Sequence, residues 1–290
     1  MRVEAQPVDG ESFQFIATLA KELSTGNVSL PAIPDIAARV LTALDDETVT
    51  TDKLERIVSS EPVLAARIVQ LANSAALNFT GRRVSELRTA IARVGFGMVR
   101  TTSMAYALAQ LRRSKLFETI QQPLSVLWNR CTLVAAMSRV AAVRISRVNP
   151  DTAMFAGLLH GVGELYILAR ASEHSELLAA DAAYRQVVSD WNKRLAQEIL
   201  ESWEIDEQVT AAIAGFQEFE RSHDGPVDLT DVLTVGYLLS AYMNHPESLE
   251  LNMADVAICR RLGLNRADYE ALIESSREEI SALREALDYS

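Results

Sequence analysis

Apolar residues recur at helical spacing along most of the chain. Between Pro34 and Leu44 they return every three or four positions, and the segment that begins at Pro62 shows the same pattern. A period of about 3.6 residues predicts amphipathic helices that each bury one face. Ser60, just before Pro62, predicts a serine-capped helix start with the proline in the first turn. We therefore expect a chain built from helices.

Glycine, proline and short polar stretches divide this pattern into further segments. Additional helices are expected at residues 84–94, 98–111, 125–147, 151–159, 162–178, 184–203, 207–219, 229–243, 253–262 and 266–287. Turns or loops are expected at residues 78–83, 95–97, 121–123 and 222–226. Glycine and proline are few, 12 and 8 among 290 residues, so helix is favoured over strand almost everywhere. The predicted fold class is all-α.

The bulk composition limits the partners. Hydrophobic residues make up 49% of the chain, which is ample for a large buried core. Lys and Arg total 28 against 39 Asp and Glu, so the formal net charge is -11. Phosphate backbones are repelled by such a charge unless a basic face is clustered, and the sequence shows no such cluster. We therefore expect no nucleic-acid partner.

Cysteine usage and the N-terminus bear on the compartment. Cys131 and Cys259 lie far apart and outside any Cys-x-x-Cys spacing, which is typical of reduced, buried thiols. The first residues lack the features of a signal peptide, and no apolar run approaches the ~20 residues of a membrane span. The sequence predicts a cytoplasmic protein that does not enter the membrane.

Three segments carry a resemblance to a known family. They are Leu-Pro-Ala-Ile-Pro-Asp-Ile-Ala at residues 30–37, the helix-forming stretch from Ser60 to Ala75, and Phe-Ala-Gly-Leu-Leu-His-Gly-Val-Gly-Glu-Leu at residues 155–165. Together they resemble the HDOD family, over roughly residues 24–217. The resemblance implies a multi-helix orthogonal bundle like that of the HD phosphohydrolases. It also implies a bacterial signalling protein that has lost catalysis and acts by binding other proteins.

The resemblance also implies where a metal site would stand. HD hydrolases gather a His, an adjacent His-Asp pair and a later Asp around a divalent ion. Here the pair is His160 followed by Gly161, and Arg130 stands near the position of the first His. The helix expected at residues 229–243 has no carboxylate in its central part, the nearest being Asp231. We therefore expect no metal and no cofactor, and we interpret His160 as a packed core residue that donates to a backbone carbonyl.

One alternative ligand pair remains in the sequence. His160 and Glu164 are four residues apart and would share a helical face if the helix continued through Gly161 and Gly163. Each glycine costs about 1 kcal/mol relative to alanine inside a helix, which argues against that continuation. The pair is therefore kept as the basis of an alternative, a divergent HD-type phosphohydrolase.

Candidate partner-binding or anion-binding residues follow from the same segments. They are Leu30, Pro31, Pro34, Asn73, Ser74, Arg130 and His160. Each also has a structural interpretation: the prolines stiffen a helix start, and Asn73 and Ser74 satisfy carbonyls at a helix end. Arg130 and His160 could line a relict pocket that holds a small anion or nucleotide.

The predicted organisation has three parts: an N-terminal helical lead at residues 1–23, an HDOD domain at 24–221, and C-terminal helices packed on its core at 222–290. The leading hypothesis is a non-enzymatic signal-transduction module. Its expected partners are signalling proteins in trans, namely a kinase, a receiver or a cyclic-di-nucleotide enzyme, and a homodimer is left open. The alternatives are the divergent phosphohydrolase and a nucleotide-sensing domain without hydrolysis.

Overall fold

The computed structural model describes residues 10–28, 30, 35–78, 80–172, 174–244 and 256–289. These residues form helices and connecting turns without a β-strand, which confirms the all-α fold class. The elements are α1 (Gly10–Ser24), α2 (Asp35–Leu44), α3 (Thr51–Val58), α4 (Pro62–Ala72), α5 (Leu87–Val94), α6 (Phe96–Arg112), the short 3-10 helix η1 (Lys115–Ile120), α7 (Gln121–Ile145), α8 (Pro150–Leu159), α9 (Val162–Ala171), α10 (Ser175–Ala179), α11 (Asp181–Ser202), α12 (Glu207–Gly215), α13 (Leu229–Asn244), α14 (Ala257–Leu262), α15 (Arg266–Ser275) and α16 (Arg277–Leu287).

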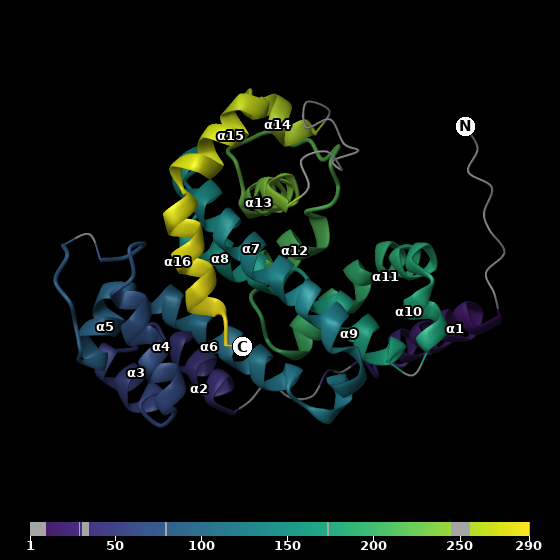
Figure 1. Cartoon of the computed structure of the whole chain (residues 1–290), viewed down its shortest axis with the longest axis horizontal. Coiled ribbons are helices and arrows are strands. Elements are labelled where there is room, and N and C mark those ends of the chain that lie inside the picture. The colour runs from purple at the N-terminus through teal and green to yellow at the C-terminus, as the bar shows by residue number, and fades with distance from the viewer. Residues whose placement is uncertain are drawn as a thin grey trace.

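Helix α7 occupies the centre of the molecule (Figure 1). It packs most extensively against α8 and α13, and it also contacts α9 and α16. Helices α2 to α6 pack on one another at one side, and α9 to α11 lie with α1 at the other. The central helices are buried over most of their length, so the core sits where α7, α8 and α13 meet.

Two glycines allow the central helices to approach closely. A Cβ atom added at Gly157 in α8 would lie 2.7 Å from the Cα atom of Ala135 in α7. One added at Gly236 in α13 would lie 2.8 Å from the Cα atom of Ser138, which is also in α7. Both contacts are with backbone atoms, so any larger residue must push two helices apart.

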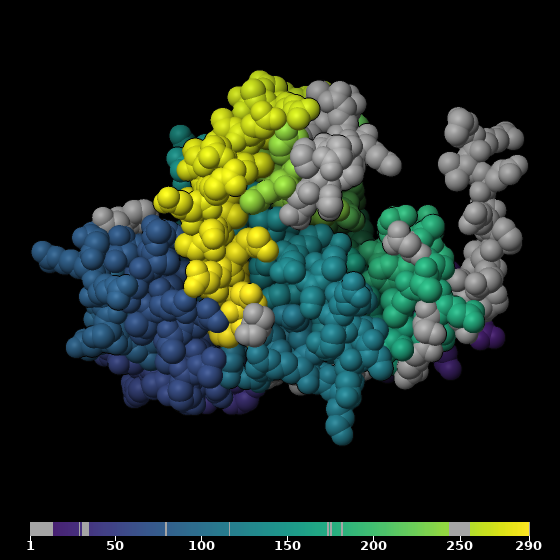
Figure 2. All heavy atoms as spheres, in the orientation of Figure 1, coloured from purple at the N-terminus to yellow at the C-terminus, as the bar shows by residue number. Residues whose placement is uncertain are grey.

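The last helix ties distant parts of the chain together. Figure 2 shows α16 in yellow, running down beside the N-terminal helices drawn in blue. The Arg67 side chain donates to the carbonyl of Glu285 at 3.0 Å, and its guanidinium lies 4.9 Å from the centre of the Tyr289 ring. The Tyr289 hydroxyl donates to the carbonyl of Thr102 at 3.2 Å, and Tyr289 is buried. Residues after 222 thus contact α4, α6 and α7, while the predicted domain boundaries stay predictions.

Several predicted boundaries were wrong. The turn expected at residues 95–97 is shorter, because α5 ends at Val94, only Gly95 intervenes, and α6 begins at Phe96. Gly97 lies inside α6, where a Cβ atom would lie 2.5 Å from the Cβ atom of Asp151. The break expected at residues 121–123 is instead the first turn of α7. A proline is tolerated there, because the first amide groups of a helix have no intrahelical acceptor.

Other differences concern helix ends. The helix expected at residues 266–287 is divided at Ser276 into α15 and α16, and α3 was not predicted. The predicted serine cap was also wrong: Glu61 is the N-cap residue of α4 and makes no capping bond through its side chain. The Ser60 hydroxyl instead donates to the carbonyl of Ile57 at 2.7 Å, at the end of the preceding helix.

Helices α8 and α9 together form a 22-residue stretch, Pro150–Ala171, that is long and apolar enough to cross a membrane. In the window that passes this test, 89% of the residues are buried inside the fold. A core helix of a soluble protein has this property, because it is apolar on all sides. The stretch is therefore explained by its place at the centre of the molecule.

Candidate functional site

His160 lies at the junction of α8 and α9, in the core of the fold. Helix α8 begins with Asn149 as its cap, whose side chain accepts from the amides of Asp151 and Thr152, and with Pro150 in the first turn. The close contact at Gly157 then holds its C-terminal end against α7. These local features place His160 among the buried side chains of the central helices, with 2% of its surface exposed.

The imidazole of His160 is held as a neutral ring. Its Nδ1 atom lies 2.7 Å from the carbonyl oxygen of Gly157, as predicted for a packed core histidine. The ring also meets Phe216 and Tyr237 edge-on, with centroid distances of 5.5 and 6.0 Å. Burial, and secondarily the nearby charge of Arg130, lower the pKa of His160 to about 3. Nδ1 therefore carries the proton, and Nε2 has no hydrogen-bond partner within the described part of the chain.

This low pKa makes the stability of the fold depend on pH. In the unfolded chain His160 would titrate near 6.5, so its stabilising contribution is complete above that pH and is lost as the pH falls toward 3. Between pH 7 and pH 5 the loss is about 2 kcal/mol. We expect urea unfolding of the wild type to show this loss relative to His160→Gln, which cannot titrate. Parallel pH profiles for the two proteins would contradict the assignment.

Gly161 stands where the family resemblance would place the metal-binding Asp, and its surroundings are filled. A Cβ atom added there would lie 2.6 Å from the Sγ atom of Cys131 and 2.9 Å from Cδ1 of Leu127. Both contacts come from α7, which passes directly over the junction. Burial raises the pKa of Cys131 to about 12, so its thiol stays protonated and inert. A carboxylate at position 161 would have to displace these side chains.

Arg130 and Glu164 form an ion pair across the α7–α9 contact. Arg130 keeps 34% of its side chain exposed and Glu164 only 14%. Burial opposes the charge on Arg130, but the neighbouring groups, with the carboxylate of Glu164 foremost, together raise the pKa of the guanidinium. Tyr184 also donates to Glu164, at 3.5 Å. Glu164 is therefore engaged by a fixed cation, which disfavours its use as a metal ligand beside His160, and Arg130 is not a free anion-binding group.

The remaining candidates have mainly structural contacts. The side-chain amide of Asn73 donates to the carbonyls of Val69 and Val84 at 3.0 and 2.7 Å, and its oxygen accepts from the amide of Val84 at 2.8 Å. The Ser74 hydroxyl donates to the carbonyl of Leu71 at 2.7 Å. These bonds confirm the predicted role of satisfying backbone groups at the end of α4. The two residues also line a groove of about 330 Å³ between α4 and α16.

The other residues of the first segment are less informative. Leu30 is 6% exposed and belongs to the hydrophobic core, while Pro31 and Pro34 lie outside the described residues. The structure therefore does not bring the five described candidates into one site. His160 and Arg130 are neighbours, Asn73 and Ser74 lie at the end of α4, and Leu30 packs separately.

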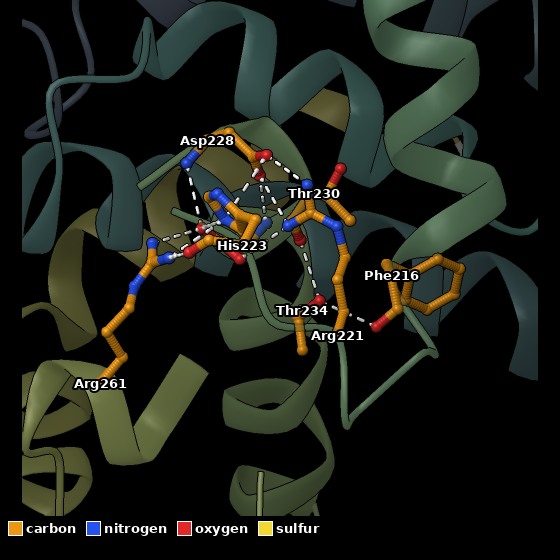
Figure 3. A network of polar contacts seen from close by, with 8 residues as sticks. Phe216, Arg221, His223, Asp228, Thr230, Thr234 and Arg261 are labelled. Carbon is orange, nitrogen blue, oxygen red and sulfur yellow. Dashed lines mark hydrogen bonds and ion pairs between the residues drawn. The ribbon is translucent and has the colours of Figure 1, made fainter. Parts of the chain in front are cut away.

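A polar cluster that brings together Arg221, His223, Asp228 and Arg261 was not predicted (Figure 3). Among the described residues, His223, Asp228 and Asp231 offer three ligand atoms within 4.8 Å of one another. The carboxylate of Asp231 accepts from His223 at 2.9 Å, from Arg261 at 2.8 Å and from Arg221 at 3.0 Å. Two guanidinium groups thus neutralise the cluster, and a divalent ion would have to displace them. The sequence does not show that these residues meet, because the partners of Asp231 come from a loop and from α14.

Comparisons with known proteins agree with this fold. A protein from Shewanella amazonensis, provisionally named a metal-dependent phosphohydrolase, superposes with a TM-score of 0.78 at 20% identity over 97% of this chain and 100% of that one. An HDOD domain protein from Geobacter sulfurreducens gives 0.64 at 24% identity over 96% and 98%. A provisionally named signal transduction protein from Marinobacter aquaeolei gives 0.63 at 20% identity over 97% and 67%.

At these identities the structural neighbours show the fold alone. A comparison with curated proteins gives no match. The family profile of the HDOD domain matches residues 30–219, which include the His160 junction, the central helix α7 and the polar end of α4. This chain belongs to the HDOD family.

Proposed function

We propose that this chain is a non-catalytic bacterial signalling module that acts by binding other proteins. The observation that carries the proposal is the filled space at Gly161, where the side chains of Cys131 and Leu127 would have to shift to admit a metal-binding carboxylate. A hydrolytic metal site needs several nitrogen and oxygen ligands with one position open to water. Around His160 the neighbours are aromatic rings, a protonated thiol and a guanidinium already paired with Glu164.

The proposed partners are a kinase, a receiver or a cyclic-di-nucleotide enzyme, bound in trans in the cytoplasm. The support is the family membership, together with the signal-transduction name given to the Marinobacter aquaeolei protein of the same fold. The net charge of -11 disfavours nucleic acid as the partner. The composition therefore favours proteins over nucleic acids as partners.

Metal content and hydrolysis test the proposal. The purified chain is expected to hold no stoichiometric Mn, Fe, Ni or Zn. It is also expected to hydrolyse p-nitrophenyl phosphate and its bis ester, with any of these metals added, no faster than His160→Gln. Metal-dependent turnover that His160→Gln abolishes would overturn the proposal.

The proposed binding to signalling proteins is tested by cross-linking in a bacterial host, followed by reconstitution with the purified partners. Failure to find any signalling protein that binds this chain directly would count against the proposal.

A divergent phosphohydrolase is the second candidate. It is favoured by the unpartnered Nε2 atom of His160 and by the name given to the Shewanella amazonensis protein of this fold. It requires Glu164 to leave Arg130 and turn to a metal, which breaks a partly buried ion pair. Stoichiometric metal in the wild-type protein would favour this candidate.

The alternative of a nucleotide-sensing domain without hydrolysis is tested separately, by the thermal shift of the purified chain against a panel of nucleotides.

A further inference from the structure

Helix α2 carries a groove along each side of its exposed ridge. Ala38 and Thr42 are both exposed and line both grooves. At 100° per residue, Leu41 and Asp45 fall on one side of this ridge and Arg39 and Ala43 on the other. The groove on the first side measures about 360 Å³ and is closed by the end of α11. The groove on the second side measures about 690 Å³ and is closed by α3.

The first groove is acidic. Asp45 and Glu204 line its rim, both side chains are exposed, and neither has an ion-pair partner among the residues described. Arg100 attracts Asp45 from a distance without forming an ion pair. Leu41 and the half-buried Trp203 supply an apolar floor. We call this feature the acidic groove.

The second groove is basic. Arg39, Lys53 and Arg56 line it together with Ile57. Arg56 donates to the backbone oxygen of Asp52 at 3.2 Å and has no carboxylate partner in the described part of the chain. The ion pairs Arg39–Asp35 and Lys53–Asp46 are solvent-exposed and therefore weak. We call this feature the basic groove.

We propose that the two grooves join two copies of this chain in a symmetric dimer, with the Ala38–Thr42 ridges packed against each other. A two-fold axis that runs along α2, between the paired helices, places the acidic groove of each copy on the basic groove of the other. A two-fold axis perpendicular to α2 would instead place the acidic groove of one copy on the acidic groove of the other. The charge pattern therefore favours the arrangement in which the two α2 helices are parallel. Small side chains at positions 38 and 42 let the two helices approach closely.

A second copy fits both grooves at once, whereas other ligands fit only one. A nucleic acid would meet Asp45 and Glu204 beside the basic groove and would be repelled. A divalent ion would need more ligands than the acidic groove offers, since the only group of three found among the described residues is at His223. The dimer is independent of the proposed signalling role, and either can fail without the other.

The first test is sedimentation velocity of the full chain over a range of concentrations. At low salt we expect a monomer–dimer equilibrium whose dissociation constant rises about tenfold or more at high salt, because the contacts pair charges at a solvated rim. Ala38→Trp places a large side chain on the ridge and should leave only monomer. The matched control is Glu118→Arg, an exposed acid on η1 outside both grooves, which should dimerise like the wild type.

The second test is a charge exchange. Glu204→Arg and Arg56→Glu should each weaken self-association about tenfold or more, because like charges then face each other twice in the dimer. An equal mixture of the two variants should dimerise as well as the wild type, because every facing pair is again opposite in charge. The four substituted positions are all solvent-exposed, and unchanged thermal unfolding of the variants excludes loss of folding. A wild type that stays monomeric at low salt, or a dimer that Ala38→Trp and both charge reversals leave intact, would overturn the proposal.

Discussion

Replacing Arg130 by methionine is expected to lower the free energy of unfolding by about 3 kcal/mol, because Glu164, whose side chain is only 14% exposed, is then left without its cation. This is the lower end of the range for buried pairs, since Arg130 keeps about a third of its side chain in contact with water. Chemical denaturation of the wild type and the variant measures the difference.

Two controls separate the loss of the pair from the loss of packing. The double variant Arg130→Met/Glu164→Gln should recover most of the stability, because no uncompensated charge remains. Arg88→Met breaks the exposed ion pair with Asp52 and should cost no more than about 1 kcal/mol. If Arg130→Met and Arg88→Met lowered the free energy of unfolding by the same amount, the Arg130–Glu164 pair would contribute no more to stability than the exposed pair.

Substitution of Gly157 by alanine is expected to cost about 3 kcal/mol, although alanine is the better helix former. The added Cβ atom would lie 2.7 Å from the Cα atom of Ala135 and 2.9 Å from the carbonyl oxygen of Val134. Because these are backbone atoms, α7 and α8 must separate along their whole contact. Urea unfolding monitored by circular dichroism tests the loss.

Gly215→Ala is the matched control for this change. Gly215 also lies in a helix, but a Cβ atom there meets only a methyl group of Thr230, at 3.2 Å. It should therefore change the stability by less than about 1 kcal/mol. A second check is Gly157→Ala/Ala135→Gly, which should stay unstable, since removing the Ala135 side chain leaves the clashing Cα atom in place. Full recovery in that variant would contradict the backbone contact.

The sequence predicted local features better than contacts between distant segments. The packed state of His160 followed from its apolar neighbours, and the role of Asn73 at the end of α4 followed from general helix-end chemistry. Helix periodicity located the main elements, because each helix shows its buried face in its own sequence. Boundaries failed where tertiary contacts decided them, as at Gly97, which packs on Asp151 instead of forming a turn.

The electrostatic pairs could not be predicted in the same way. Glu164 was considered as a ligand partner of His160, but it pairs with Arg130, 34 residues earlier in the chain. Asp231 is held by His223 and Arg261, which lie on opposite sides of it in sequence. Such pairs depend on how helices are placed relative to one another, and the period of a single helix carries no information on that placement. The use of the candidate residues in partner binding stays a prediction.

The contact between Arg67 and the carbonyl of Glu285 joins residues that are 218 positions apart. Helix α7 likewise packs on α13, from a distant part of the sequence. Bringing together residues that are so far apart in the chain lowers the chain entropy before the stabilising contacts have formed. Folding rates therefore fall as the mean sequence separation of contacts grows. This all-helical protein should therefore fold more slowly than a bundle of the same size whose helices contact only their neighbours in the chain.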